Sequence, residues 1–204
     1  MRPFVALAAC LAAAGLAASG APAPDPCEEA KRSNGWCEAA HAGYVAGVEV
    51  RSSFLFEVLD TDGHGIIPAE VKCETCRKAL LSDGYCPIHR MGYAHGEAFM
   101  SALTWHLARA RVVSPSTLTC RACRRHTRGI GWCDRDHVGI AGYFAVDDRR
   151  EFEELAKEYD LLLAAIEKSA SCEICAGAMI TNGYCRIHRL TWRDGSPVDA
   201  ARQE

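Results

Sequence analysis

The sequence has no excess of one charge and, beyond its first residues, no long apolar run. The chain has 204 residues and a formal net charge of −3. A strongly basic domain is typical of nucleic-acid binding, so nucleic acid is not a predicted partner. No set of nucleophile, base and acid and no phosphate-binding loop stands out, and enzyme activity is therefore not predicted. We expect a protein partner instead, which the sequence does not identify.

The first 20 residues have the pattern of a secretory signal. A basic start, Met1-Arg2, is followed by an apolar stretch over 4–18 and then by small residues up to Gly20. The stretch is shorter than the roughly 20 residues that a membrane-spanning helix needs. We therefore expect cleavage near Gly20, no transmembrane segment in the mature chain, and export to the periplasm or beyond the cell. A lipoprotein anchor at Cys10 is not favoured, because the apolar run continues past that residue.

Cysteine is abundant, and it recurs in repeated units. The chain has 12 cysteines, and the predicted signal contains Cys10. The last three units share one spacing of their cysteines, with a histidine two or three residues further on, whereas a leading unit has Pro24 in place of its first cysteine. In chain order the units are Cys27-x9-Cys37-x3-His41, Cys73-x2-Cys76-x9-Cys86-x2-His89, Cys120-x2-Cys123-x9-Cys133-x3-His137 and Cys172-x2-Cys175-x9-Cys185-x2-His188. Pairs of units share details, which indicates duplication of a two-unit block.

Three cysteines and a histidine are a standard ligand set for structural zinc. Each complete unit therefore predicts one closed zinc site, three in all, although soft sulfur ligands also suit copper(I) or iron. A disulfide framework is the alternative in an oxidising compartment. It does not account for a histidine after the last cysteine of every unit.

The leading unit is incomplete, and its state stays open at this point. Cys27, Cys37 and His41, with Asp25 as an oxygen ligand, would form an incomplete metal site and raise the zinc count to four. An open coordination position is what catalytic zinc uses, so an enzyme or thiol oxidoreductase would act here. The other interpretation is a Cys27–Cys37 disulfide without metal.

The residues between the second and third cysteines suggest a β-hairpin. In the last unit, 178–181 lead into Asn182-Gly183, a strong hairpin turn signal, and Asp83-Gly84 repeats it. The pattern resembles zinc-ribbon and knuckle fingers, in which paired ligands sit at the ends of a short hairpin. The resemblance implies this geometry and nothing about activity.

Helical periodicity separates the units. Apolar residues recur on one face over 148–169, and shorter patterns cover 97–112 and 53–59. We therefore predict a small α+β protein of tandem zinc-ribbon or knuckle-like hairpin fingers joined by amphipathic helices. The predicted divisions are a signal at 1–20, a first two-finger block at 21–112, a second at 113–195, and a polar tail at 196–204.

Two further motifs have a plainer interpretation. Residues 60–67 resemble the start of an EF-hand loop, but Val71 stands where a bidentate Glu is required, so calcium is not predicted. The basic run over 121–128 is interpreted as a surface of charged side chains that are exposed to solvent. The predicted function is a zinc-stabilised scaffold or interaction module, and buffering or sensing of soft metal ions is the alternative.

Overall fold

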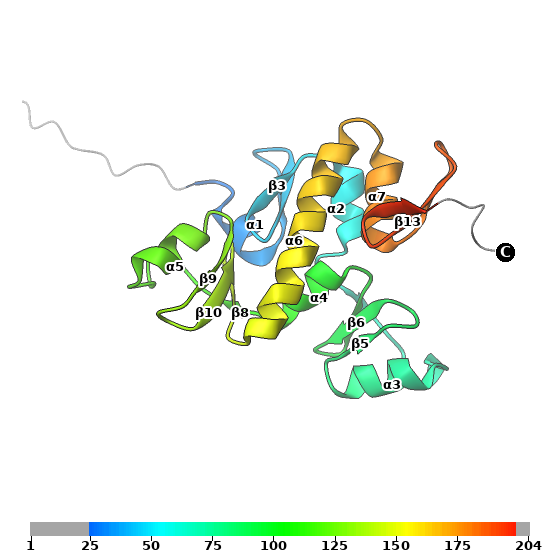
Figure 1. Cartoon of the computed structure of the whole chain (residues 1–204), viewed down its shortest axis with the longest axis horizontal. Coiled ribbons are helices and arrows are strands. Elements are labelled where there is room, and N and C mark those ends of the chain that lie inside the picture. Colours follow the sequence, from blue (N-terminus) through cyan, green and yellow to red (C-terminus); the bar gives the residue numbers. More distant parts are fainter. Residues whose placement is uncertain (1–24, 199–204) are drawn as a thin grey trace, which may run out of the picture.

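The computed structural model describes residues 25–198. The predicted signal and the end of the predicted tail lie outside these residues. Four small fingers of similar construction surround a long central helix, α6 (Arg149–Ser169) (Figure 1). Within the described part of the chain, no helix has the length and apolar character that crossing a membrane requires.

Each finger consists of one short helix followed by three antiparallel strands. Finger one contains α1 (Glu28–Ser33), β1 (Trp36–Cys37), β2 (Ala42–Val45) and β3 (Val48–Val50). Finger two contains α3 (Glu74–Leu81), β5 (Tyr85–Cys86), β6 (Met91–Ala94) and β7 (Glu97–Phe99). Finger three contains α5 (Arg121–His126), β9 (Ile130–Cys133), β10 (Val138–Ala141) and β11 (Phe144–Val146). Finger four contains α7 (Glu173–Thr181), β12 (Tyr184–Cys185), β13 (Leu190–Arg193) and β14 (Ser196–Val198).

Helices follow the first three fingers. They are α2 (Ser53–Leu59), α4 (Ala102–Arg109) and α6. A 3-10 turn, η1 (Pro68–Glu70), precedes finger two. The short strands β4 (His64–Gly65) and β8 (Arg111–Val112) each extend one sheet, β4 beside β7 and β8 beside β11. The predicted α+β class is confirmed.

The hairpin predicted between the second and third cysteines is wrong, because a helix occupies that segment. In finger four, α7 runs through it and ends where Asn182 adopts a left-handed conformation with φ of 54°. The N–H of Gly183 then donates to the carbonyl of Ala178 at 2.8 Å. Asn-Gly suits a helix end as well as a hairpin turn, since both need positive φ. The equivalent bond recurs from Gly35 to Ala30 and from Gly84 to Ala79.

The hairpin lies instead after the last cysteine of each finger. Its turns at Ala46-Gly47, His95-Gly96 and Asp194-Gly195 have positive φ at both residues, as type I′ turns require. One predicted boundary is wrong, because residues 97–99 form β7 and the helix predicted at 97–112 is confined to α4. Residues 196–198, at the start of the predicted tail, form β14.

Two of the predicted helices are confirmed, and each has a side-chain cap. The Asp148 side chain accepts from the N–H of Glu151 at 2.7 Å at the start of α6. Ser52 accepts from the N–H of Leu55 at 3.1 Å at the start of α2. Such caps satisfy backbone donors that the first helical turn leaves free.

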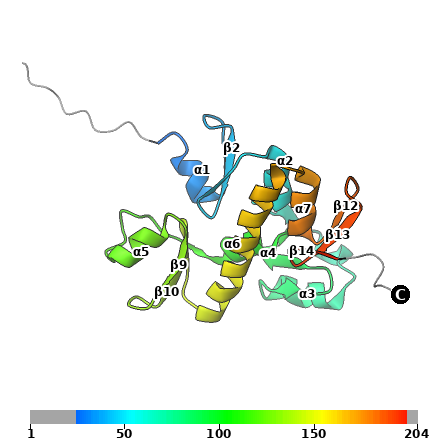
Figure 2. The same ribbon diagram turned by 45° about the horizontal axis from the view of Figure 1, so that its top comes forward.

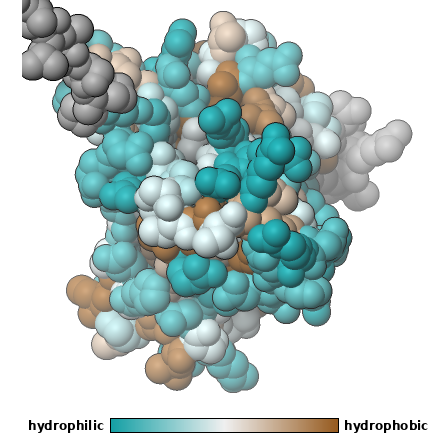
Figure 3. All heavy atoms as spheres, turned by 90° about the vertical axis from the view of Figure 1, so that its left-hand side faces the viewer, coloured by the Kyte–Doolittle hydropathy of each residue, from teal (hydrophilic) through white to brown (hydrophobic). Residues whose placement is uncertain are grey.

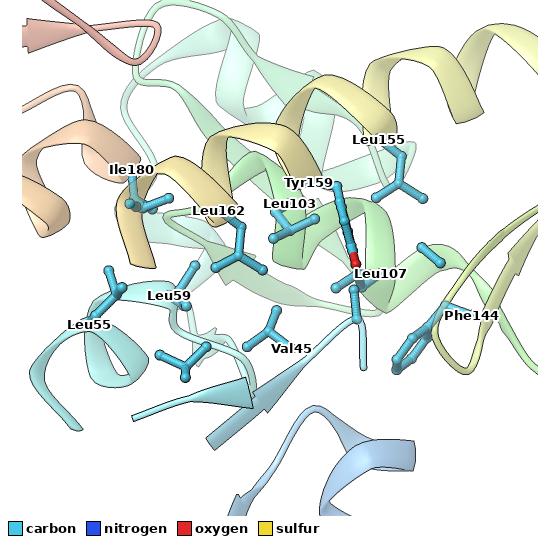
Figure 4. Close-up of a cluster of buried hydrophobic side chains, with 14 of the residues drawn as sticks. Val45, Leu55, Leu59, Leu103, Leu107, Phe144, Leu155, Tyr159, Leu162 and Ile180 are labelled. Carbon is cyan, nitrogen blue, oxygen red and sulfur yellow. The ribbon is translucent and has the colours of Figure 1, made fainter. Parts of the chain in front are cut away.

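One hydrophobic core joins both predicted blocks (Figure 4). Leu155, Tyr159 and Leu162 of α6 face it, together with side chains from α2 and α4. Fingers one and three add residues from their hairpins, and α7 of finger four adds Ala176 and Ile180. Finger two packs mainly in a separate cluster and lies beside α4 in both ribbon views (Figures 1 and 2).

An aromatic ring covers the sheet of each of the first three fingers. Phe56 of α2 lies on Gly43 so closely that a Cβ there would be 2.0 Å from the ring. Trp36, directly opposite Gly43, meets the same ring with centroids 5.5 Å apart. The same three-part contact joins Trp105, Gly92 and Tyr85 in finger two, and Phe152, Gly139 and Trp132 in finger three. In finger four, Thr191 takes the glycine position, and Tyr184 opposite it is 57% exposed.

Candidate metal centres

The structure gathers three clusters of metal-ligand side chains, one in each of fingers two, three and four. Within each cluster the ligand atoms all lie within 4.8 Å of one another. The clusters are Cys73, Cys76, Cys86 and His89; Cys120, Cys123, Cys133 and Asp136; and Cys172, Cys175, Cys185 and His188. The nine cysteines are not joined by disulfides.

Distances within the clusters match a single tetrahedral ion. Bonds of about 2.3 Å to sulfur and 2.0 Å to nitrogen place two sulfurs about 3.8 Å apart, and sulfur and nitrogen about 3.5 Å apart. The Sγ atoms of Cys172 and Cys185 are 3.9 Å apart, and His188 Nδ1 lies 3.1 and 3.7 Å from the Sγ atoms of Cys175 and Cys185. In finger two, His89 Nδ1 lies 3.2 and 3.8 Å from the Sγ atoms of Cys76 and Cys86. The residues present therefore fit zinc in size and in donor type.

The finger fold positions each ligand. The first cysteine precedes the helix, as Cys73 precedes α3, and the second lies in the first helical turn. The third ends the strand after the helix, and the fourth ligand lies in the turn before the next strand. A side chain seven positions after the third cysteine is buried against the sulfurs: Tyr93, Ile140 or Trp192. This packing keeps water from the sulfurs.

The thiols within a cluster differ in acidity. In finger two, a hydrogen bond from the backbone of Cys76 lowers the pKa of Cys73 to about 7, whereas burial raises the pKa of Cys76 to about 11. In finger four, burial acts to raise the pKa of Cys185, but hydrogen bonds from the backbone of His188 and from neighbouring side chains outweigh it and lower the pKa to about 6. Burial raises the pKa of Cys175 to about 12. Fingers two and four thus each contain a cysteine close to its thiolate form, which is the form that binds metal.

Finger three differs from the prediction at its fourth position. The structure places Asp136 in the cluster, with Oδ2 at 3.1 Å from Cys123 Sγ, whereas the predicted ligand His137 is exposed and outside it. His137 has a φ of 49° and occupies the left-handed position that Arg90 and Arg189 occupy in the other clusters. Asp136 stands three residues after the last cysteine, as His89 and His188 do. This spacing makes Asp136 a candidate from the sequence, but the adjacent His137 is the more usual zinc ligand, so spacing alone does not choose between them.

Finger one has a disulfide in place of a metal cluster. Cys27 and Cys37 are bonded, with Cα atoms 5.3 Å apart, so the incomplete metal site considered for this finger is not formed. His41 occupies the left-handed position with φ of 49°, and its side chain is exposed. Asp25 accepts from the N–H of Cys27 at 2.9 Å and pairs with Lys31, which lowers the pKa of this carboxyl group. None of the four residues is therefore placed as a metal ligand.

The EF-hand-like segment after α2 forms a turn and a short strand. Asp60 ends α2 in a left-handed conformation, and its Oδ2 lies 3.0 Å from His64 Nδ1. His64 then enters β4, which pairs with β7. Among the other histidines, His95 in the hairpin turn of finger two contacts the carbonyl of Ala108, and His106 is buried in α4.

The fold and the three clusters define a class of protein: a repeat of small cysteine-rich fingers that forms a metal-binding module. Each cluster lies between a short helix and a β-hairpin. The chain matches no protein-family model and shows no significant similarity to a curated protein or to a solved structure. The arguments about function therefore rest on the geometry of the fingers.

Proposed function

We propose that the protein binds three zinc ions that stabilise its fingers, and that the resulting rigid repeat serves as a scaffold or interaction module. The observation that carries this proposal is the presence of three clusters with donor atoms at tetrahedral spacing. A closed structural zinc site contributes on the order of 10 kcal/mol to folding. Zinc would therefore stabilise fingers whose own cores are small.

Exposed apolar side chains support the interaction role. Ile88 and Ile187 occupy equivalent places in the turn before the fourth ligand of fingers two and four, and they are 69% and 63% exposed. Both lie on rigid turns next to a metal cluster. Pre-ordered apolar side chains contact a protein partner at little cost in conformational entropy.

Export belongs to the same proposal. The Cys27–Cys37 disulfide supports an oxidising compartment, because such bonds are rare in the reducing cytosol. Both cysteines are buried, at 5% and 4% exposure, which keeps external thiolates from the sulfurs and disfavours a thiol oxidoreductase at this finger. Cell fractionation and N-terminal sequencing test export: a mature chain that begins near residue 21 is expected, and an intact Met1 in the cytosolic fraction would contradict it.

Native mass spectrometry tests the metal content. The protein is measured as isolated and again after denaturation in chelator, and three zinc ions per chain are expected in the first spectrum only. The variant Cys86→Ser should lose one ion, whereas the matched variant Ser82→Ala, in the same finger but outside the cluster, should keep all three. A metal-free mass with disulfides among the nine remaining cysteines would overturn the proposal.

A further inference from the structure

Finger three has a weaker set of ligands than the other two metal clusters. Its fourth donor is the carboxylate of Asp136, where fingers two and four have the imidazoles of His89 and His188. Imidazole and thiolate suit zinc, whereas carboxylate suits harder ions such as magnesium or calcium. An ion in finger three would therefore be released most easily at the Asp136 bond.

A second group is placed to hold the Asp136 carboxylate once it leaves the metal. Arg135 Nε donates to Asp136 Oδ1 at 3.1 Å, while Oδ2 faces Cys123. No comparable partner of His89 or His188 is found among residues 25–198, apart from the cysteines of their own clusters.

Four exposed arginines lie on or directly after α5, the helix that contains the ligand Cys123. They are Arg121, Arg124, Arg125 and Arg128, which we call the arginine surface. Arg121 lies between the ligands Cys120 and Cys123, and Arg124 follows directly. Within residues 25–198, no ion pair involves any of the four arginines. Figure 3 views the molecule from the side on which α5 lies, and hydrophilic residues predominate there.

Unpaired arginines next to a negatively charged metal cluster attract anions to it. Three thiolates and a carboxylate exceed the charge of a divalent ion, and the arginines offset this excess. Positive side chains raise the local concentration of small anions and their rate of arrival, an effect that salt weakens. An anionic chelating ligand would therefore reach finger three faster than fingers two and four, which, among residues 25–198, have fewer exposed arginines without an ion pair beside their ligands.

We infer that finger three is a metal-exchange site, at which a small anionic chelating ligand displaces Asp136 and then removes or delivers the ion. This inference rests on the proposed binding of three ions, and it assigns different roles to them. The ions of fingers two and four maintain the structure. The ion of finger three can leave, because its bond to the Asp136 carboxylate is weaker than a bond to imidazole.

The exchange is a ligand substitution and involves no redox step. The incoming donor supplies the electron pair of the new bond to the metal, and the metal–oxygen bond breaks with its electron pair on Asp136. The carboxylate then remains with Arg135. As the ion departs, the three thiolates either take up protons from water or bind an incoming ion, and the metal keeps its oxidation state throughout.

The experiment follows zinc loss from the full chain by native mass spectrometry over time. Two probes are compared: ethylenediaminetetraacetate, which is anionic, and phenanthroline, which is neutral. The wild-type protein should lose one ion on the order of tenfold faster than the other two. Asp136→His should remove the fast phase, and His89→Asp should produce a second one. Arg121→Gln with Arg125→Gln should slow loss to the anionic chelator and leave loss to the neutral chelator unchanged.

The control His137→Ala separates the two ligand assignments. It should lose zinc as the wild type does, and Asp136→Ala should lose one ion faster. Faster loss in His137→Ala with no effect of Asp136→Ala would make His137 the ligand and overturn the inference. Loss of all three ions at one rate would overturn the inference alone. A protein that is isolated without any ion would overturn the proposed function and the inference together.

Discussion

Fingers one and two have the same backbone fold, but finger one contains a disulfide where finger two has a cluster of metal ligands. Both have a helix that ends in the same glycine hydrogen bond, from Gly35 to Ala30 and from Gly84 to Ala79. Finger two then brings four ligands together, whereas finger one has lost its first cysteine to Pro24 and has Ala40 at the fourth ligand position. The two cysteines that remain form a disulfide.

The comparison shows that the finger depends on more than its metal ligands. Finger one keeps the helix end, the hairpin turn and the buried aromatic residue Tyr44, which packs against Cys27 and Cys37. It also keeps the ring of Phe56 over its sheet and contacts finger three, where the Tyr143 hydroxyl donates to Glu28 at 3.0 Å. A single disulfide is sufficient to hold the finger fold where neighbouring parts of the chain supply additional packing.

Removal of metal by a chelator should give the largest difference in stability between finger one, which has a disulfide, and the fingers that have metal clusters. Removal of zinc should unfold fingers two and four, because each of their closed sites contributes on the order of 10 kcal/mol. The helical circular dichroism signal should fall as zinc is released, while the disulfide of finger one remains. A phosphine reductant without chelator is the control, and most of the signal should survive it. A metal-free protein with unchanged dichroism would contradict the distinction.

Loss of the disulfide should have a smaller effect. The bond closes a short loop, with a sequence separation of 10. Replacement of both Cys27 and Cys37 by alanine should lower the free energy of unfolding by about 3 kcal/mol, mainly because the unfolded chain gains freedom. Urea unfolding of zinc-loaded protein measures this change. Equal stability of variant and wild type would mean that finger one needs no cross-link.

The residue at the position of Gly43 should matter for stability in finger one. Its counterpart in finger four, Thr191, should matter little. Gly43→Ala should cost about 2 kcal/mol, because its Cβ would lie 2.0 Å from the ring of Phe56. In finger four the equivalent Thr191 is only partly buried, so Thr191→Ala should be close to neutral. Gly65→Ala is a matched control, since its Cβ would meet nothing within 4 Å. Thermal unfolding of the three variants tests the order, and equal losses would contradict it.

The residue before the glycine that closes each finger helix, Asn34 in finger one and Asp83 in finger two, should show the smallest difference. Asn34 is buried, and its Oδ1 accepts from the N–H of Ala46 at 2.8 Å, whereas Asp83 makes the same bond to His95 at an exposed site. Both have positive φ, so alanine is strained at either position. Asn34→Ala should cost about 1 kcal/mol more than Asp83→Ala, because no water reaches the N–H that it leaves unpaired. Urea unfolding measures the difference, and a larger loss for Asp83→Ala would refute this explanation.

Local signals predicted much of this structure correctly. The periodic apolar face and the cap at Asp148 predict α6, since a long amphipathic stripe has one stable packing arrangement. The repeated spacing also predicts which cysteines gather in fingers two and four. The hairpin signals misled because Asn182-Gly183 ends a helix, and the turn that does form a hairpin is Asp194-Gly195. Positive φ is a local requirement, and the chain context decides which structure uses it.

The sequence by itself determined the four repeats, the cysteine clusters of fingers two and four, the α+β class and the long helix. These follow from spacing and periodicity, which are local along the chain. Only the tertiary structure decided that Asp136, not His137, faces the third cluster, and that Cys27 bonds to Cys37. The direction of a side chain after a turn depends on one backbone angle, and the pairing of two thiols depends on the distance between them. Neither quantity is fixed until the helix, turn and strands of the finger pack together.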